Sequence, residues 1–276
     1  MKLERKNFAQ VLKDAKIDYK REYRRLYEMF YESEINQEKN VLRDACAANF
    51  WNMPIRGTCL SLDDFDDYYE IKFEKEPEDF DLNYLLNFCE YTYNLVMYTT
   101  FSTWGYGFQT PRDAFMIQLN RVADLIGYMF SASENGVSIL VPKDQTAIAV
   151  AETLDRNLSY RVIEYNHNSM RGNLDKKRNI LIVLADKLEA NRKKLNQINS
   201  KMEDHLYFLL NNLNIRHNNT EQGSKEYRKY VADMDKETLE KWYDETYQMC
   251  LLAFLELDNL ERKEKVEQLK QALNSF

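Results

Sequence analysis

Glycine and proline are scarce in this chain of 276 residues, which holds 7 Gly and 4 Pro. Because these residues interrupt helices and form tight turns, so few of them favour long helices over many short strands. Hydrophobic residues make up 44% and charged residues 30% of the chain, which is the composition of a folding sequence rather than a disordered one. The length suffices for one large domain or two small ones.

Residues for metal and thiol chemistry are also few. The three histidines form no HxxH or HExxH pattern, which excludes the usual zinc and di-metal spacings. The four cysteines lie far apart without a CxxC pair, and they indicate reduced thiols rather than a disulfide framework. No phosphate loop, GxGxxG or GxSxG motif occurs. We therefore expect neither a metal nor a cofactor.

Long apolar runs are missing as well. None is long enough to span a bilayer, and no apolar stretch follows Met1, so the sequence predicts a cytoplasmic protein without a membrane segment or a signal peptide. The formal net charge of −7 excludes a uniformly basic nucleic-acid-binding domain, although it leaves room for local basic patches.

The hydrophobic periodicity predicts a mainly α fold, namely a helical bundle with a small β-sheet of two or three strands. Helices are expected at 3–31, 37–50, 82–98, 115–129, 146–154, 173–213 and 239–254, with a possible fresh start near 200 and an amphipathic tail after 254. Strands are expected at 69–73, 137–141 and 160–165, the last two joined by a helical crossover. We place the N-terminal helical region at 1–132 and the second part at 133–276.

One polar cluster interrupts the helical pattern: the stretch LLNNLNIRHNNTEQG, Leu209 to Gly223, with an adjacent Arg216 and His217. Metal-free RNA cleavage needs a group that takes a proton from the ribose 2′-hydroxyl, which His217 can supply, and a cation for the phosphate, which Arg216 can supply. Asn218 and Asn219 could position the phosphate or a base by amide hydrogen bonds. The same residue types also suit the capping of a helix C-terminus, and both interpretations stay open.

A second basic group surrounds the start of the long helix expected at 173–213. Arg171, Lys176, Lys177 and Arg178 flank an Asn173 helix cap in RGNLDKKRN. Backbone N–H groups at a helix N-terminus, together with nearby cations, make a phosphate-binding site. A solvated charged face is the alternative.

The C-terminal part, about 173–276, resembles the HEPN class of helical proteins, which occur in abortive-infection phage-defence systems and toxin–antitoxin pairs. The resemblance lies in the helix that ends in NNLNIRHNN, the loop after it, and the helix LEKWYDETYQMCLLAFLELDNLER. It implies a helical bundle, often dimeric, and in many members a metal-independent ribonuclease. The hallmark of the class is Arg followed four to six residues later by His. Here Arg216 and His217 are adjacent, whereas Arg161 and His167 fit the spacing but fall on a predicted strand.

Together these features predict an intracellular defence-like or toxin-like homodimer, either a metal-independent ribonuclease or an RNA-binding protein. The alternative is a non-catalytic interaction or sensor module of a larger defence system. In that case the 19 tyrosines and the acidic surface would dock a protein partner. A small-molecule sensor built on the central sheet is a third possibility, for which no residue pattern names a ligand.

Overall fold

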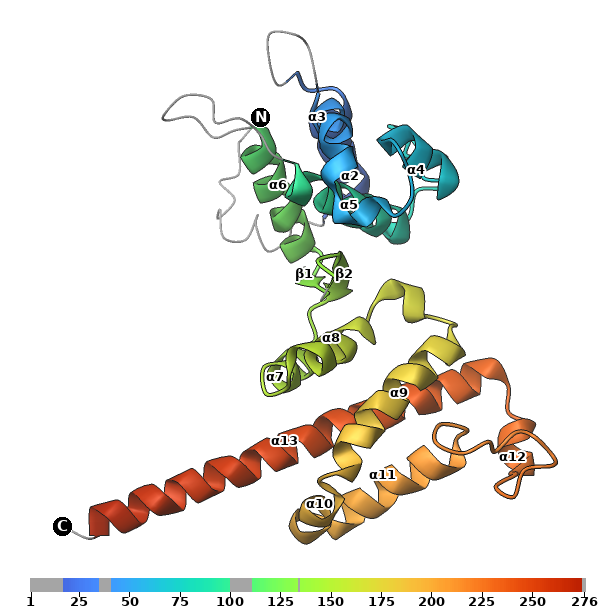
Figure 1. Cartoon of the computed structure of the whole chain (residues 1–276), viewed down its shortest axis with the longest axis vertical. Coiled ribbons are helices and arrows are strands. Elements are labelled where there is room, and N and C mark those ends of the chain that lie inside the picture. Colours follow the sequence, from blue (N-terminus) through green and yellow to red (C-terminus); the bar gives the residue numbers. More distant parts are fainter. Residues whose placement is uncertain (1–16, 35–40, 100–110, 134, 275–276) are drawn as a thin grey trace, which may run out of the picture. The chain divides into compact units, whose positions relative to one another are not determined.

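The structure, a computed structural model, describes residues 17–34, 41–99, 111–133 and 135–274. The chain divides into two compact units, residues 1–140 and 141–276 (Figure 1). The mainly α fold with a small sheet is confirmed. The boundary expected between 132 and 133 lies at the turn that joins the two strands. The first half of the helix expected at 3–31 and the start of the one at 37–50 lie outside the described residues.

Unit 1 consists of five described helices, two 3₁₀ turns and a two-stranded antiparallel sheet within the ranges above. The elements are α2 (Tyr19–Tyr31), α3 (Leu42–Asn49), η1 (Phe50–Asn52), η2 (Pro54–Arg56), α4 (Leu62–Tyr68), α5 (Leu82–Tyr98), α6 (Pro111–Leu125), β1 (Tyr128–Ala132) and β2 (Ser138–Pro142). The helix expected at 82–98 has the bounds of α5. Helix α6 ends earlier than expected, because Gly127 turns the chain at a φ of 77° and Met129 lies on β1.

The core of unit 1 is rich in aromatic side chains. Helix α2 buries Tyr23, Leu26 and Phe30, spaced three and four residues apart, so that all three lie on one face. Phe88 of α5 packs edge-on against the rings of Tyr23 and Phe30, at centroid separations of 5.1 and 6.3 Å. The tyrosines of this part therefore serve mainly as packing residues.

The strand predicted at 69–73 is wrong. Side chains along residues 71–76 alternate between half-buried and exposed, whereas Tyr69, at the start of the expected buried face, is exposed. However, the backbone there bonds to side chains of helices rather than to a second strand: Tyr23 Oη donates to the Glu74 carbonyl, and the Glu74 N–H donates to Tyr84 Oη at 2.9 Å. Alternation alone does not distinguish an extended segment on a helical surface from a strand.

Strands β1 and β2 meet at a turn that contains Gly136, at a φ of 81°. A Cβ added to Gly136 would lie 2.2 Å from Tyr98 Oη, which itself donates to the Gly136 carbonyl at 2.7 Å. The turn therefore needs glycine for its backbone conformation and also for the approach of Tyr98.

Replacing Gly136 by alanine is expected to lower the free energy of unfolding by about 2–4 kcal/mol, because backbone strain and a steric clash add together. Gly172→Ala is the matched control, since Gly172 also has a positive φ of 70° but a Cβ there meets nothing within 4 Å. Urea unfolding of both variants measures the difference. Equal losses would show that the approach of Tyr98 contributes nothing.

In the described residues of unit 2 after the end of β2, helices joined by turns and loops form the regular structure, without a further strand. Its elements are α7 (Gln145–Ala151), α8 (Arg156–Glu164), η3 (Asn168–Met170), α9 (Leu174–Glu189), α10 (Arg192–Ile198), α11 (Ser200–Asn212), α12 (Lys229–Ala232) and α13 (Lys236–Asn274). Helix α13 packs against α9, α10 and α11, and its C-terminal half extends beyond the other helices of the unit (Figure 1).

Three expectations for unit 2 need correction. The strand predicted at 160–165 is wrong: the segment is helix α8, which buries Leu158 and Val162, so the strand–helix–strand crossover does not exist. The long helix expected at 173–213 is three helices: the break at Asn199 agrees with the fresh start expected near 200, whereas the break at 190–191 was not expected. The helix at 239–254 and the tail after it form one helix, α13.

Candidate functional site

The asparagines after α11 hold the loop together. Asn214, at a left-handed φ of 56°, exchanges two hydrogen bonds with Asn219: its N–H donates to Asn219 Oδ1 at 2.7 Å, and its Oδ1 accepts from the Asn219 N–H at 3.1 Å. Asn219 is 0% exposed, and its side-chain amide also donates to the Glu226 carbonyl at 2.7 Å. The polar groups of the Asn219 side chain are thus occupied within the loop. Asn218 is exposed and bonds to Glu221 at 2.7 Å.

Arg216 belongs to a compact group of charges around Tyr207. Its Nη1 lies 2.7 Å from Glu189 Oε2, and its guanidinium lies 5.9 Å from the centre of the Tyr207 ring. Arg192 stacks closer on the same ring, at 3.9 Å, and pairs with Glu203 at 2.5 Å. These two arginines and two glutamates balance in charge, so a phosphate at Arg216 would also meet the negative charge of Glu189.

The buried carboxylate of this group is held ionised. Burial opposes ionisation of Glu203, but hydrogen bonds from Arg192 and Asn196 outweigh it and lower its pKa below the ordinary range. Burial also raises the pKa of Tyr207 to about 12. His217 lies beyond this group as an exposed side chain. The catalytic role assigned to Arg216 and His217 stays a prediction.

The basic residues around the start of α9 divide into two kinds. Asn173 caps the helix, as expected, by accepting a hydrogen bond from the Lys176 N–H at 3.1 Å. Lys177 is buried, with Nζ 2.6 Å from Asp244 and 2.7 Å from Glu240 on α13.

Arg178 donates from Nε to the Ile215 carbonyl at 3.3 Å. This bond is a direct link between the two predicted basic groups. Only Arg171 and Lys176, of the four cations around Asn173, present exposed side chains.

The buried end of Lys177 anchors α9 to α13. Its ammonium lies 5.4 Å from the centre of the Tyr165 ring, which stacks on Tyr247 at 4.0 Å. Burial opposes ionisation of Glu240, but bonds from Lys177 and from a backbone N–H lower its pKa. Lys177 therefore stabilises the packing of α9 against α13.

A concave site lies between α8 and α9, with a volume of about 320 Å³. Its polar lining comes from Arg161, Glu164, Ser169, Lys176 and Asn179. Arg161 Nη1 and Glu164 Oε2 are 2.7 Å apart at the surface. Lys176, one of the cations predicted to bind phosphate at the start of α9, thus lines the same cavity as Arg161 of α8.

His167 stands next to this cavity through Ser169. Its Nδ1 lies 2.8 Å from Ser169 Oγ and 3.2 Å from the Ser169 backbone nitrogen, so that it caps the short η3 turn. Because Ser169 lines the cavity, the imidazole is one side chain removed from Arg161 and Lys176.

Arg161 and His167 are the pair with HEPN-like spacing, and the strand prediction had separated them from a helical context. The structure places Arg161 on α8 and His167 just after it. The sequence held a signal for this helix: Asp155 accepts a hydrogen bond from the Leu158 N–H at 3.1 Å, as an N-cap residue does.

Comparison with known proteins found no relative: no family model, no curated protein and no solved structure matches this chain. The candidate site depends on geometry alone. Within the described ranges no group of three or more His, Cys, Asp or Glu side chains could hold a metal ion. No helix there is both long and apolar enough to cross a membrane. All four cysteines are buried and unbonded to one another.

Proposed function

We propose that this chain is an intracellular RNA-binding protein of the defence or toxin type, and that unit 2 binds RNA in the cavity between α8 and α9 and cleaves it without a metal. The observation that carries this proposal is that Arg161 and Lys176 line one cavity, and that His167 adjoins it through its contact with Ser169. The N-terminus of α9 adds backbone N–H groups, which favour an anion.

The chemistry follows from these groups. With Nδ1 accepting from the Ser169 N–H, a neutral imidazole carries its proton on Nε2; catalysis uses the other tautomer, in which Nδ1–H donates to Ser169 Oγ, the cap on η3 is released, and the base is Nε2. That nitrogen takes the proton from a ribose 2′-hydroxyl, the 2′-oxygen bonds to phosphorus, and the bond to the 5′-oxygen breaks. The leaving oxygen takes a proton from water, and the product ends in a 2′,3′-cyclic phosphate. Arg161 and Lys176 balance the charge that develops on the phosphate.

Arg216 and His217 are the alternative catalytic pair, with Asn218 beside them. Their support is the HEPN resemblance and the exposure of His217. Both arginines have a carboxylate partner, Glu189 for Arg216 and Glu164 for Arg161, so Arg161 is favoured because it lines a cavity together with Lys176. The three histidine variants described in the Discussion decide between the two pairs.

RNA binding is tested by reversing one charge in the cavity. We expect Lys176→Glu to raise the dissociation constant for a single-stranded RNA oligonucleotide about tenfold or more, and to reduce the salt dependence of binding by about 0.7 in log–log slope. Lys201→Glu is the control, because Lys201 is an exposed lysine of unit 2 on α11 and carries the same charge change. Fluorescence anisotropy in two salt concentrations measures both variants. Wild-type protein that does not bind RNA, or equal effects of the two variants, would refute the proposal.

The proposal includes a homodimer, because one Arg and one His per chain become a fuller site across a two-fold axis. Its support is the end of α13, where the exposed Val266, Leu269 and Leu273 recur three and four residues apart, the spacing of a coiled-coil seam. Two copies of this face would bury side chains that are otherwise in water.

We expect Leu269→Lys to convert a dimer of the 33.0 kDa chain into a monomer in light scattering coupled to size-exclusion chromatography. The reason is that a charge at the seam would have to be buried. Gln268→Lys adds the same charge beside the seam and should leave the dimer intact. A wild-type protein that is monomeric at micromolar concentration contradicts this part of the proposal.

A protein-interaction module is the second candidate. A shallow apolar site of about 300 Å³ lies between α11 and α13, where Phe208, Leu209, Trp242 and Met249 line it. Phe208 is 63% exposed, which is unusual for a phenylalanine without a partner. Inert RNA assays, together with a co-purifying protein that Phe208→Ser releases, would favour this candidate.

A further inference from the structure

Unit 1 contains a larger cavity, of about 550 Å³, than either site of unit 2 described above. It lies between α5 and the segment 69–73, which turns at Tyr69 and Glu70 and is extended from Ile71 onward, and side chains of α4 and η2 and Val137 complete its lining. Its volume is within the range of small-molecule sites. The cavity belongs to unit 1 alone and takes no part in the proposed RNA chemistry.

Aromatic rings dominate the walls of this cavity. Phe65 and Tyr69 contribute from α4 and its end, Phe73 from the extended segment, and Tyr84 and Tyr91 from α5. Phe73 contacts the rings of Tyr84 and Tyr91 at centroid separations of 5.6 and 5.5 Å, and Phe65 contacts Tyr69 at 4.6 Å. Such a lining offers both apolar contact and electron-rich ring faces.

The charged groups at the cavity are mainly carboxylates. Glu90 lines it from α5, and its Oε2 accepts a hydrogen bond from the Leu140 N–H at 2.7 Å, which fixes the carboxylate in place. Glu70 adds a second negative charge. The one lining lysine, Lys72, pairs with Glu74 at 2.8 Å and has an 82% exposed side chain, so its charge lies in solvent.

The surrounding chain has the same sign of charge. Residues 61–90, which supply most of the lining, hold eleven Asp or Glu and two Lys. Low-dielectric walls lined by one sign of charge concentrate ions of the opposite sign. An anion or a nucleotide is disfavoured here, and a cation is favoured.

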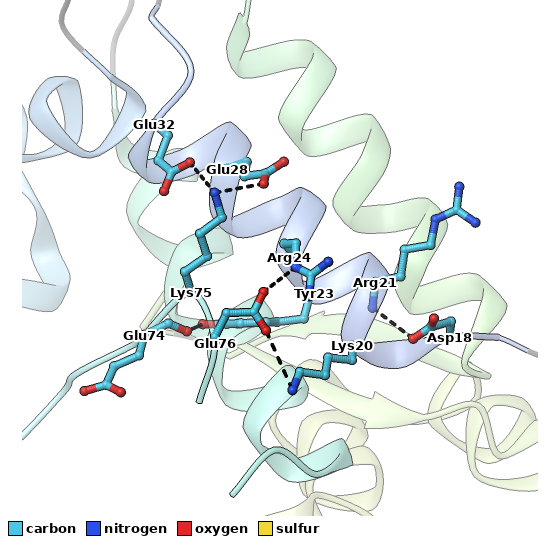
Figure 2. Close-up of polar contacts among 10 residues, drawn as sticks. All are labelled: Asp18, Lys20, Arg21, Tyr23, Arg24, Glu28, Glu32, Glu74, Lys75 and Glu76. Atoms are coloured by element: carbon cyan, nitrogen blue, oxygen red, sulfur yellow. Dashed lines mark hydrogen bonds and ion pairs between the residues drawn. The ribbon is translucent and has the colours of Figure 1, made fainter. Parts of the chain in front are cut away.

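The extended wall is held in place before any ligand binds. Figure 2 shows the segment after Phe73 lying along α2, where Glu76 meets Arg24 at 2.5 Å and Lys20 at 3.7 Å. Lys75 reaches Glu28 and Glu32 at 3.0 and 2.7 Å. The hydrogen bond from Tyr23 to the Glu74 carbonyl ties the backbone itself to α2. A preformed wall reduces the entropic cost of binding.

We propose that this cavity binds a small organic cation, a quaternary or protonated amine with an apolar body, held by the aromatic rings and by the Glu90 carboxylate. Aromatic faces attract such cations more strongly than neutral molecules of the same shape. A carboxylate fixed at the wall adds a charge-assisted contact. This inference is independent of the proposed RNA function.

The test uses the full chain and a matched pair of probes. Choline and its neutral carbon isostere, 3,3-dimethylbutan-1-ol, differ in charge but hardly in shape. By isothermal titration calorimetry we expect choline to bind about tenfold more tightly, since a cation–π contact of about 1–2 kcal/mol corresponds to roughly five- to thirtyfold in affinity. Chemical-shift changes in the NMR spectrum should map to the cavity. Equal binding of both probes, or the absence of choline binding, overturns the proposal.

Two variants and a control locate the site. Tyr69→Leu removes a ring that is 53% exposed, and Glu90→Gln keeps an acceptor for the Leu140 N–H, so that both should fold. Each should weaken choline binding about three- to tenfold. Tyr68→Leu changes the neighbouring tyrosine, which is 73% exposed and does not line the cavity, and should have no effect. Choline binding that responds equally to Tyr68→Leu and Tyr69→Leu, or to neither cavity variant, also overturns it.

Discussion

Replacing His167 by alanine is expected to reduce the rate of RNA cleavage by about 10²- to 10⁴-fold, the usual contribution of a general base. His167 is the one histidine that adjoins a cavity with two cations, since Ser169 connects it to the site that Arg161 and Lys176 line. The loss should appear in the rate constant at saturating RNA rather than in the dissociation constant, because the imidazole acts on the proton and the cations hold the phosphate.

The chain has only two other histidines, and both provide controls. His217→Ala removes the alternative proton acceptor, and His205→Ala removes an exposed histidine on α11. Single-turnover cleavage of a labelled RNA, with the chelator EDTA present throughout, compares all three variants. A loss confined to His217→Ala would move the catalytic centre to the Asn-rich loop. Full activity in all three variants would exclude histidine catalysis, and the absence of cleavage by the wild type would leave only the RNA-binding proposal, which Lys176→Glu tests separately.

The fold class could be predicted from the sequence because helical periodicity persists over long stretches. The helix at 82–98 illustrates this, since a long segment with apolar residues on nearly every side is expected to form a buried helix. Short segments were harder. Residues 69–73 alternate in polarity and residues 160–165 are rich in β-branched and aromatic side chains, yet the first segment lies on helices from Ile71 onward and the second falls in helix α8. Five or six residues are too few to distinguish the helical period of hydrophobic residues from the strand period when the neighbouring element is unknown.

The candidate site was predicted only in part, for reasons that lie in tertiary contacts. The sequence predicts the same phosphate-binding role for Lys176 and Lys177. Their environments differ because α13 packs against α9, so that Lys177 is buried against Asp244 while Lys176 lines a cavity. The spacing of Arg161 and His167 matches the HEPN pattern, but the predicted strand at 160–165 argued against a helical site there. Asp155 as an N-cap residue, followed by the apolar Leu158 and Val162 at helical spacing, is a sequence pattern that indicates a helix here rather than a strand.

The Asn-rich loop yields the second large effect, which concerns stability. Asn219→Ala is expected to lower the free energy of unfolding by about 2–4 kcal/mol, because it leaves the Asn214 N–H and the Glu226 carbonyl without their partners in a buried place. Asn218→Ala is the matched control. Asn218 is exposed and contacts only its near neighbours, so its loss should cost about 1 kcal/mol or less.

Urea unfolding followed by circular dichroism measures both changes, and RNA affinity separates the two interpretations of Asn219. If Asn219 acts through the fold, the folded variant binds RNA within about twofold of the wild type while its unfolding midpoint falls, because 0% exposure leaves no surface for a ligand to touch. If it contacts RNA, the dissociation constant rises while stability hardly changes. The second result would mean that the loop opens on binding, since the two side-chain bonds of Asn219 cannot be kept while its amide reaches a phosphate.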